Sequence, residues 1–127
     1  MTIYLATPYS DSDPAVMLHR FNVVTEVSAK LMMQGKFVFS PITHSHPIAQ
    51  YMDAEKRVSW EYWERFDTEF MSWCREVYVL MLPGWKESVG VNAEIRLANK
   101  LGKRITYINE KLEPLMIDNS RVEEIYG

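Results

Sequence analysis

The sequence predicts an α/β domain in which a mostly parallel sheet is covered by helices on both faces. Short apolar segments typical of strands alternate along the chain with longer segments of helical periodicity. The third strand segment, residues 76–82, is almost entirely apolar, as expected of a central parallel strand buried on both faces. The 127 residues suffice for one domain with a hydrophobic core, so we expect a single domain over residues 1–127.

Each element is predicted from a local signal. Strands are expected where β-branched and aromatic residues cluster, and helices where apolar residues recur every three or four positions. The first helix has Asp13 as its N-cap and Pro14 at its first position, and the third has Ser88 as its cap. In chain order we expect a strand at 2–7, a helix from 14 to Gly35, a strand at 36–40, a long loop at 41–55, a helix at about 56–74, a strand at 76–82, a helix from Ser88 to Leu101, a strand at 104–108, a short strand at 112–117 and a last helical turn or two at 120–126.

Open parallel sheets bind their ligands at the carboxyl ends of the strands, where the connecting loops meet. Here that rule gathers three loops, at residues 8–11, 41–46 and 83–90, which are also the segments richest in Pro, Gly, Ser and His. We therefore expect a ligand crevice between these loops. The candidate substrate-binding residues there are Thr7, Pro8, Ser10, His44, His46, Trp85, Ser88 and Gly90.

Two carboxylates occupy helical positions where apolar residues are expected. Glu94 shares a face with Val91 and Ala98 and has no cation three or four residues away. Asp67 lies among aromatic and apolar residues of the second long helix, also without a cation at helical spacing. Burial of a carboxylate is costly unless the group is paired or functional. Either both side chains reach water at the edges of their apolar stripes, or they belong to an active site; the position of Glu94 near the start of its helix favours the active site for that residue.

Ser88 and Gly90 lie at the start of the same helix. The free N–H groups and the positive end of the dipole at a helix N-terminus bind anions. Ser88 is therefore a candidate phosphate ligand, and Gly90 would allow a ligand to approach the backbone closely. Helix capping alone is the simpler role for Ser88. The spacing Ser-x-Gly-x-x-x-Glu matches neither a P-loop nor a dinucleotide fingerprint.

The remaining candidates have structural alternatives. His44 and His46 have the chemistry to bind a metal together with Asp53, but no third ligand has suitable spacing, so we expect neither a metal nor a cofactor. Trp85 follows a glycine in a crevice loop. It is either a stacking surface for a base or an anchor of that loop.

Composition excludes several classes of function. The net charge of −3 provides no basic field for nucleic acid. No apolar stretch approaches the roughly 20 residues of a membrane span, and no basic leader precedes the first apolar segment, so we expect no membrane partner and no signal peptide. The single cysteine, Cys74, allows no internal disulfide and fits a reducing compartment. We expect a cytoplasmic protein that acts on a small molecule.

Two segments resemble the nucleoside 2-deoxyribosyltransferase superfamily. They are residues 3–10 (IYLATPYS) and residues 88–95 (SVGVNAEI), and the order of elements agrees over residues 1 to about 108. The chain is most similar to a small branch found in bacteria and their phages. The resemblance implies a Rossmann-like (flavodoxin-like) three-layer sandwich with four to five strands. It also implies a homodimer or larger homo-oligomer in which a neighbouring chain helps to close each site.

The same resemblance implies residue roles. Glu94 matches the family's nucleophilic glutamate, Tyr4 the tyrosine that orients it, and Asp67 an aspartate that contacts the leaving base. Ser88 stands where the enzymes that hydrolyse nucleoside 5′-monophosphates carry serine and the transferases carry aspartate. The implied reaction is a double displacement through a glycosyl-enzyme intermediate, which water or a second base then resolves.

The sequence departs from the family pattern in two loops. Ala6, Thr7 and Pro8 occupy the first turn, where a glycine is usual, and the loop at 83–87 is longer than in the hydrolases. The favoured function is N-glycosidic bond cleavage or exchange on a nucleoside 5′-monophosphate. The alternatives are a nucleoside 2-deoxyribosyltransferase, an NAD-type glycohydrolase and a non-catalytic nucleotide-binding protein.

Overall fold

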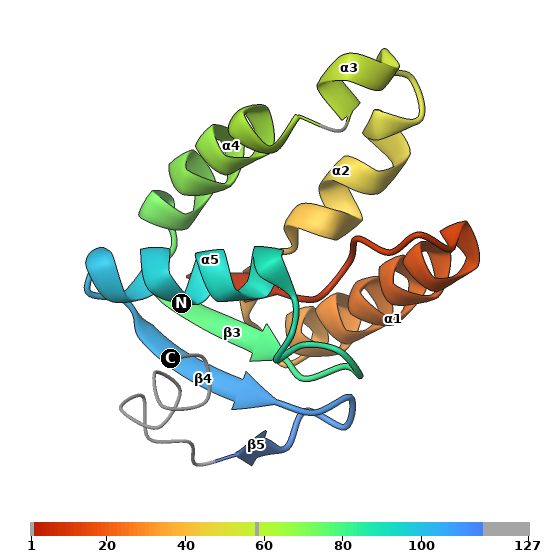
Figure 1. The fold of residues 1–127 in the computed structure, drawn as a ribbon. Helices are drawn as coiled ribbons and strands as arrows, with labels where there is room; N and C mark the ends of the chain where they lie inside the picture. Colours follow the sequence, from red (N-terminus) through yellow and green to blue (C-terminus); the bar gives the residue numbers. More distant parts are fainter. Residues whose placement is uncertain (1, 58, 116–127) are drawn as a thin grey trace.

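The computed structural model describes residues 2–57 and 59–115, and a five-stranded sheet lies at its centre (Figure 1). The strand order is β2-β1-β3-β4-β5, with the first four strands parallel and β5 antiparallel to β4. This is the flavodoxin-like order, so the predicted fold class is confirmed. The strands are β1 (Thr2–Ala6), β2 (Phe37–Phe39), β3 (Glu76–Leu80), β4 (Arg104–Ile108) and β5 (Pro114–Leu115).

Helices lie on both faces of this sheet. They are α1 (Pro14–Met33), α2 (Pro41–Ala49), α3 (Ala54–Arg57), α4 (Trp60–Trp73) and α5 (Val89–Lys100). In Figure 1, α1 lies on one side of the sheet and α5 on the other, while α2, α3 and α4 follow one another as an arch. Within the described residues, no helix is long and apolar enough to cross a membrane.

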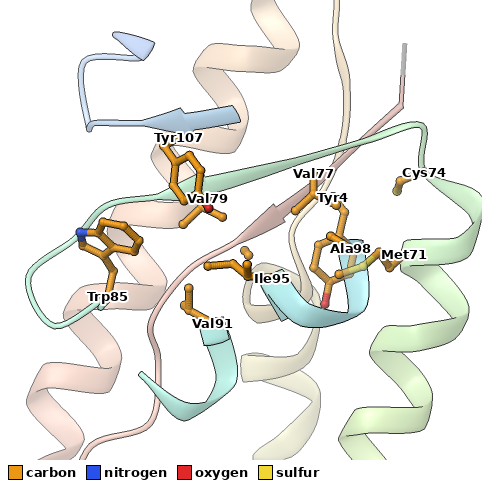
Figure 2. Close-up of a cluster of buried hydrophobic side chains, with 11 residues drawn as sticks. Tyr4, Met71, Cys74, Val77, Val79, Trp85, Val91, Ile95, Ala98 and Tyr107 are labelled. Atoms are coloured by element: carbon orange, nitrogen blue, oxygen red, sulfur yellow. The ribbon is translucent and has the colours of Figure 1, made fainter. Parts of the chain in front are cut away.

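Each face of the sheet carries its own core. Neighbouring residues of a strand point to opposite faces, so Leu5 faces α1 while Tyr4 and Ala6 face α4 and α5. The core beneath α1 consists of Leu5, Val24, Val27, Leu31, Leu80, Leu82 and Ile108. The core beneath α4 and α5, drawn in Figure 2, consists of Tyr4, Ala6, Met71, Cys74, Val77, Val79, Trp85, Val91, Ile95, Ala98 and Tyr107.

Most of the predicted helix ends are confirmed. Asp13 caps α1 by accepting the N–H of Ala15 at 2.9 Å, and Ser88 caps α5. Within the described residues, the predicted short strand at 112–117 corresponds to β5, Pro114–Leu115; residues 116 and 117 lie outside that range. The predicted helical turn at 120–126 lies outside the described residues.

The loop predicted at 41–55 is wrong, because this segment contains α2 and α3. Ser40 caps α2 by accepting the N–H of Thr43 at 3.2 Å, and Pro41 occupies the first helical position. This start signal is the same as that of α1. Pro47 lies inside α2, where it removes one N–H donor without ending this short helix.

The second long helix begins later than the predicted residue 56. Ser59 caps α4 by accepting the N–H of Tyr62 at 3.3 Å, and the helix starts at Trp60. Lys56 and Arg57 belong instead to the single turn of α3. The predicted helix therefore merged two helices that a serine cap separates.

Candidate active site

Tyr4 and Glu94 meet on the α5 side of the sheet. The Tyr4 side chain is fully buried in the middle of β1, and its hydroxyl donates a 2.5 Å hydrogen bond to Oε2 of Glu94. Figure 2 shows the Tyr4 ring beside α5, with Met71 and Ala98 around it. The two partners lie 90 positions apart in the sequence, so the fold creates this contact.

Asp67 of α4 completes a cluster with Tyr4 and Glu94. Its charge interacts with both groups and raises the pKa of the Tyr4 hydroxyl and of the Glu94 carboxyl. Burial is the main cause that raises the pKa of Asp67 to about 7 and the pKa of Glu94 to about 8. The Tyr4 hydroxyl acts in the opposite direction and lowers the pKa of both carboxyls.

The two carboxyls therefore titrate as a pair, and near neutral pH they retain a proton between them. The double displacement implied by the family resemblance needs Glu94 ionised and Asp67 at least partly protonated, and burial raises the pKa of both carboxyls. A proton shared by two interacting carboxyls belongs to the pair rather than to either residue. Nucleophilic attack combined with acid catalysis requires one ionised and one protonated carboxyl.

Ser88 and Gly90 lie at the N-terminus of α5, the helix that carries Glu94. The Ser88 Oγ accepts the N–H of Val91 at 3.1 Å, so it caps the helix and still has its own hydroxyl proton to donate. At Gly90, an added Cβ would find its nearest neighbour 3.9 Å away, at the Ser88 Oγ. This distance is an ordinary van der Waals contact, so the position would also accommodate a Cβ.

The loop after β1 contains the predicted residues Thr7, Pro8 and Ser10. Thr7 is 5% exposed, and its hydroxyl has no hydrogen-bond partner among the described residues. Pro8 is buried next to it, while Ser10 is exposed. A buried hydroxyl without a partner is unusual and costs free energy unless a ligand or water satisfies it. Thr7 is therefore the member of this loop best suited to a polar ligand contact.

His44 and His46 contact different parts of the molecule. Two residues apart on α2, they point in different directions. The Nδ1 of His46 lies 2.5 Å from the Tyr9 hydroxyl, and its ring stacks on Phe21 at 4.3 Å. His44 is exposed and lies beside aromatic rings of α4. The described residues contain no group of three side chains able to hold a metal ion.

Trp85 is the anchor of its loop. Its side chain is 9% exposed and lies in the core beneath α5, with its ring centroid 5.6 Å from that of Tyr107 (Figure 2). A buried ring leaves little surface on which a ligand base can stack. Of the two roles expected for Trp85, the structure therefore matches the loop anchor.

A row of aromatic rings next to the carboxylate cluster was not predicted as part of the site. Phe39 lies 6.1 Å from the Tyr4 ring and stacks on Phe70 at 4.4 Å, and Phe66 continues the row at 4.8 Å from Phe70. The exposed ring of His44 borders all three phenylalanines. Aromatic residues at helical spacing on α4 were visible in the sequence, but only the fold places them beside Asp67 and Tyr4.

The fold of this chain is shared with a solved structure of another protein. A solved structure described as a 2-deoxyribosyltransferase from the psychrotolerant bacterium Bacillus psychrosaccharolyticus is similar, with a TM-score of 0.60 and 20% sequence identity. The match covers 98% of this chain and 81% of that chain, and at this identity it shows the fold.

The family is shown by a second comparison. The chain belongs to the family described as "Domain of unknown function (DUF1937)", whose model matches residues 1–110. A search of curated proteins gave no match. The matched range contains every element of the candidate site, from β1 to α5.

Proposed function

We propose that this protein is an enzyme that cleaves or exchanges the N-glycosidic bond of a nucleotide, with Glu94 as its nucleophile. The observation that carries the proposal is the 2.5 Å hydrogen bond from the buried Tyr4 hydroxyl to Glu94, with Asp67 coupled to both. A structural role alone does not account for two carboxyls that have raised pKa values and no ion-pair partner among the described residues. The similarity to a protein described as a 2-deoxyribosyltransferase supports the same reaction class.

The reaction proceeds in two displacements at the anomeric carbon. A carboxylate oxygen of Glu94 attacks this carbon, the bond to the base nitrogen breaks, and its electron pair leaves with the base. Asp67 donates a proton to the departing base. Because Tyr4 holds Oε2, the other carboxylate oxygen, Oε1, is the one available for attack. Water then attacks the same carbon, gives its proton to Asp67 and releases Glu94; in a transferase a second base replaces the water.

Nucleoside 5′-monophosphates are the favoured substrates. Ser88 and the N-terminus of α5 would bind an anion on the same helix that carries the nucleophile. The hydroxyl of Thr7, which has no hydrogen-bond partner among the described residues, is a second and independent feature that supports a polar ligand. Free nucleosides and NAD-type dinucleotides remain the alternative substrates, and a non-catalytic nucleotide-binding role remains the alternative to catalysis.

Base release tests this proposal. Purified protein is incubated with nucleosides, their 5′-monophosphates and NAD, and free base is measured by chromatography. We expect release from at least one monophosphate, and its loss in Glu94→Gln, which keeps the size of the side chain. The exposed carboxylate of α4, Glu61, provides the control Glu61→Gln, which should retain activity. Tight nucleotide binding without release would favour the non-catalytic alternative.

We also propose that the protein forms a homo-oligomer through the β2 edge of the sheet. Phe37 is 69% exposed there and Trp73 is 66% exposed. These two side chains help to line an apolar groove whose residues are Thr2, Met32, Phe37, Val38, Phe39, Phe70, Trp73 and Cys74. A second copy supplies both an edge strand and matching apolar side chains, so we expect a light-scattering mass of two or more chains at micromolar concentration. Phe37→Lys should reduce that mass, and a wild-type mass of 14.9 kDa would contradict the proposal.

A further inference from the structure

One arginine of α1 connects two loops at the rim of the candidate site. The Arg20 Nη1 donates hydrogen bonds to the backbone carbonyls of Tyr9 at 3.3 Å and Ser10 at 3.2 Å. Its Nη2 donates to the carbonyl of Pro83 at 3.2 Å. Tyr9 and Ser10 belong to the loop between β1 and α1, whereas Pro83 belongs to the loop between β3 and α5. A single guanidinium therefore joins the loops that leave two adjacent parallel strands.

Gly84 makes room for this contact. Its φ of +90° is a conformation that side chains other than glycine rarely adopt. An added Cβ at this position would lie 3.0 Å from the Arg20 Nη2. The loop between β3 and α5 is thus shaped around the guanidinium, which is held by three acceptors rather than lying free on the surface.

The other side of the β1–α1 loop is held independently. The Tyr9 hydroxyl and the His46 Nδ1 form a 2.5 Å hydrogen bond, which ties this loop to α2. The loop also begins at Thr7, whose buried hydroxyl has no partner among the described residues. The polar groups proposed to contact the phosphate, Thr7 and Ser88, therefore lie on the two segments that Arg20 connects.

We infer that Arg20 is a positioning residue that fixes the β1–α1 loop relative to the β3–α5 loop and thereby sets the spacing of the phosphate-binding groups. This inference rests on the proposed function. Arg20 acts through the loops and does not touch the reacting atoms. Its removal should therefore weaken binding of a phosphorylated substrate while the chemical step on Glu94 changes little.

Four variants test this role. Arg20→Ala removes all three hydrogen bonds. Arg20→Lys keeps the charge but loses the planar, multi-donor geometry. Gly84→Ala introduces a Cβ into the contact. The matched control is Lys30→Ala, because Lys30 is a cation on the same helix whose partner is the exposed Glu26 at 3.3 Å.

Two measurements are made on each variant. Hydrogen exchange of the unliganded protein reports how firmly residues 7–12 and 83–88 are held. Steady-state kinetics with a nucleoside 5′-monophosphate give KM and kcat separately. In Arg20→Ala we expect faster exchange in both loops and a KM raised by about tenfold or more, with kcat within about threefold of wild type. Gly84→Ala should change in the same direction, Arg20→Lys should be intermediate, and Lys30→Ala should match wild type.

Specific outcomes would overturn the inference. These are unchanged exchange in both loops, faster exchange with an unchanged KM, or a loss confined to kcat. If wild-type protein binds the monophosphate without releasing base, the proposed function fails, and calorimetric Kd values of the same variants then decide the role of Arg20. If wild-type protein does not bind the monophosphate at all, both proposals fail.

Discussion

The two faces of the sheet perform different tasks, although they are built from the same strands. The hydrophobic core beneath α1 consists of aliphatic side chains, and the buried Ser28 of α1 donates its hydroxyl to the backbone carbonyl of Val24. The core beneath α4 and α5 contains the buried Tyr4 hydroxyl and lies next to Asp67 and Glu94. In β1 two neighbouring residues point to opposite faces, because Leu5 faces α1 and Tyr4 faces the carboxylates. Both faces bury apolar side chains, and the proposed function places the reactive groups on the face beneath α4 and α5.

Substitutions of Leu5 and Tyr4 should show the largest difference between the two faces. Leu5→Ala should destabilise the protein by about 2–5 kcal/mol through the cavity it creates, with kcat of the remaining folded protein unchanged. Tyr4→Phe should lower kcat about ten- to a hundredfold, because it removes a hydrogen bond to a charged group and leaves the ring in place. Denaturant unfolding and base-release kinetics measure both variants. Equal effects of the two on kcat would contradict the division between the faces.

The second test concerns substrate binding at the start of α5. Ser88→Ala should remove both the cap and the proposed phosphate contact, and we expect the preference for a monophosphate over its nucleoside to fall about tenfold or more. Ser88→Gly keeps an acceptable cap residue and serves as the control that separates helix capping from phosphate binding. Competition binding of the two ligands measures the preference. An unchanged preference in both variants would leave Ser88 as a cap only.

The third test concerns the pH dependence of stability. Burial raises the pKa of Asp67 and Glu94 in the folded protein above their usual values of 3.8 and 4.5, so the folded state binds protons more tightly than the unfolded state. Stability is therefore greatest below about pH 4 with respect to these groups, and it falls as pH rises through the folded values of about 7 and about 8.

Glu94→Gln should remove part of this loss. The Tm of the variant minus the Tm of wild type should increase as the pH rises from 5 to 9. Scanning calorimetry at several pH values measures this difference. A Tm difference that is constant over this range would show that the Glu94 carboxyl carries no raised pKa.

The sequence predicted much of the fold because the relevant signals are local. Asp13 and Ser88 were recognised as caps, and the apolar segment 76–82 marked the central strand. The prolines and histidines of the segment 41–55 favour a loop, whereas the structure shows a helix that begins after the cap at Ser40. That error shows how turn-forming composition can conceal a short helix whose start signal is present.

The site was only partly predictable for a different reason. Glu94 and Asp67 stood out because a carboxylate on an apolar helix face has no cation at helical spacing. No sequence pattern indicates the proposed role of Arg20, because its hydrogen-bond partners are backbone carbonyls up to 63 positions away. The position of Trp85 in a crevice loop is compatible with either a stacking surface or a loop anchor, and only the packing shows that its ring is buried.

The most direct test of the central claim is covalent capture of the intermediate. A nucleotide whose base is released by the protein is mixed with it, the reaction is stopped within the first turnovers by acid, and the digested peptides are analysed by mass spectrometry. We predict that the peptide containing Glu94 gains the mass of the sugar phosphate, and that the gain is absent in Glu94→Gln. Base release without any such adduct, or an adduct on another residue, would contradict the assignment of Glu94 as the nucleophile.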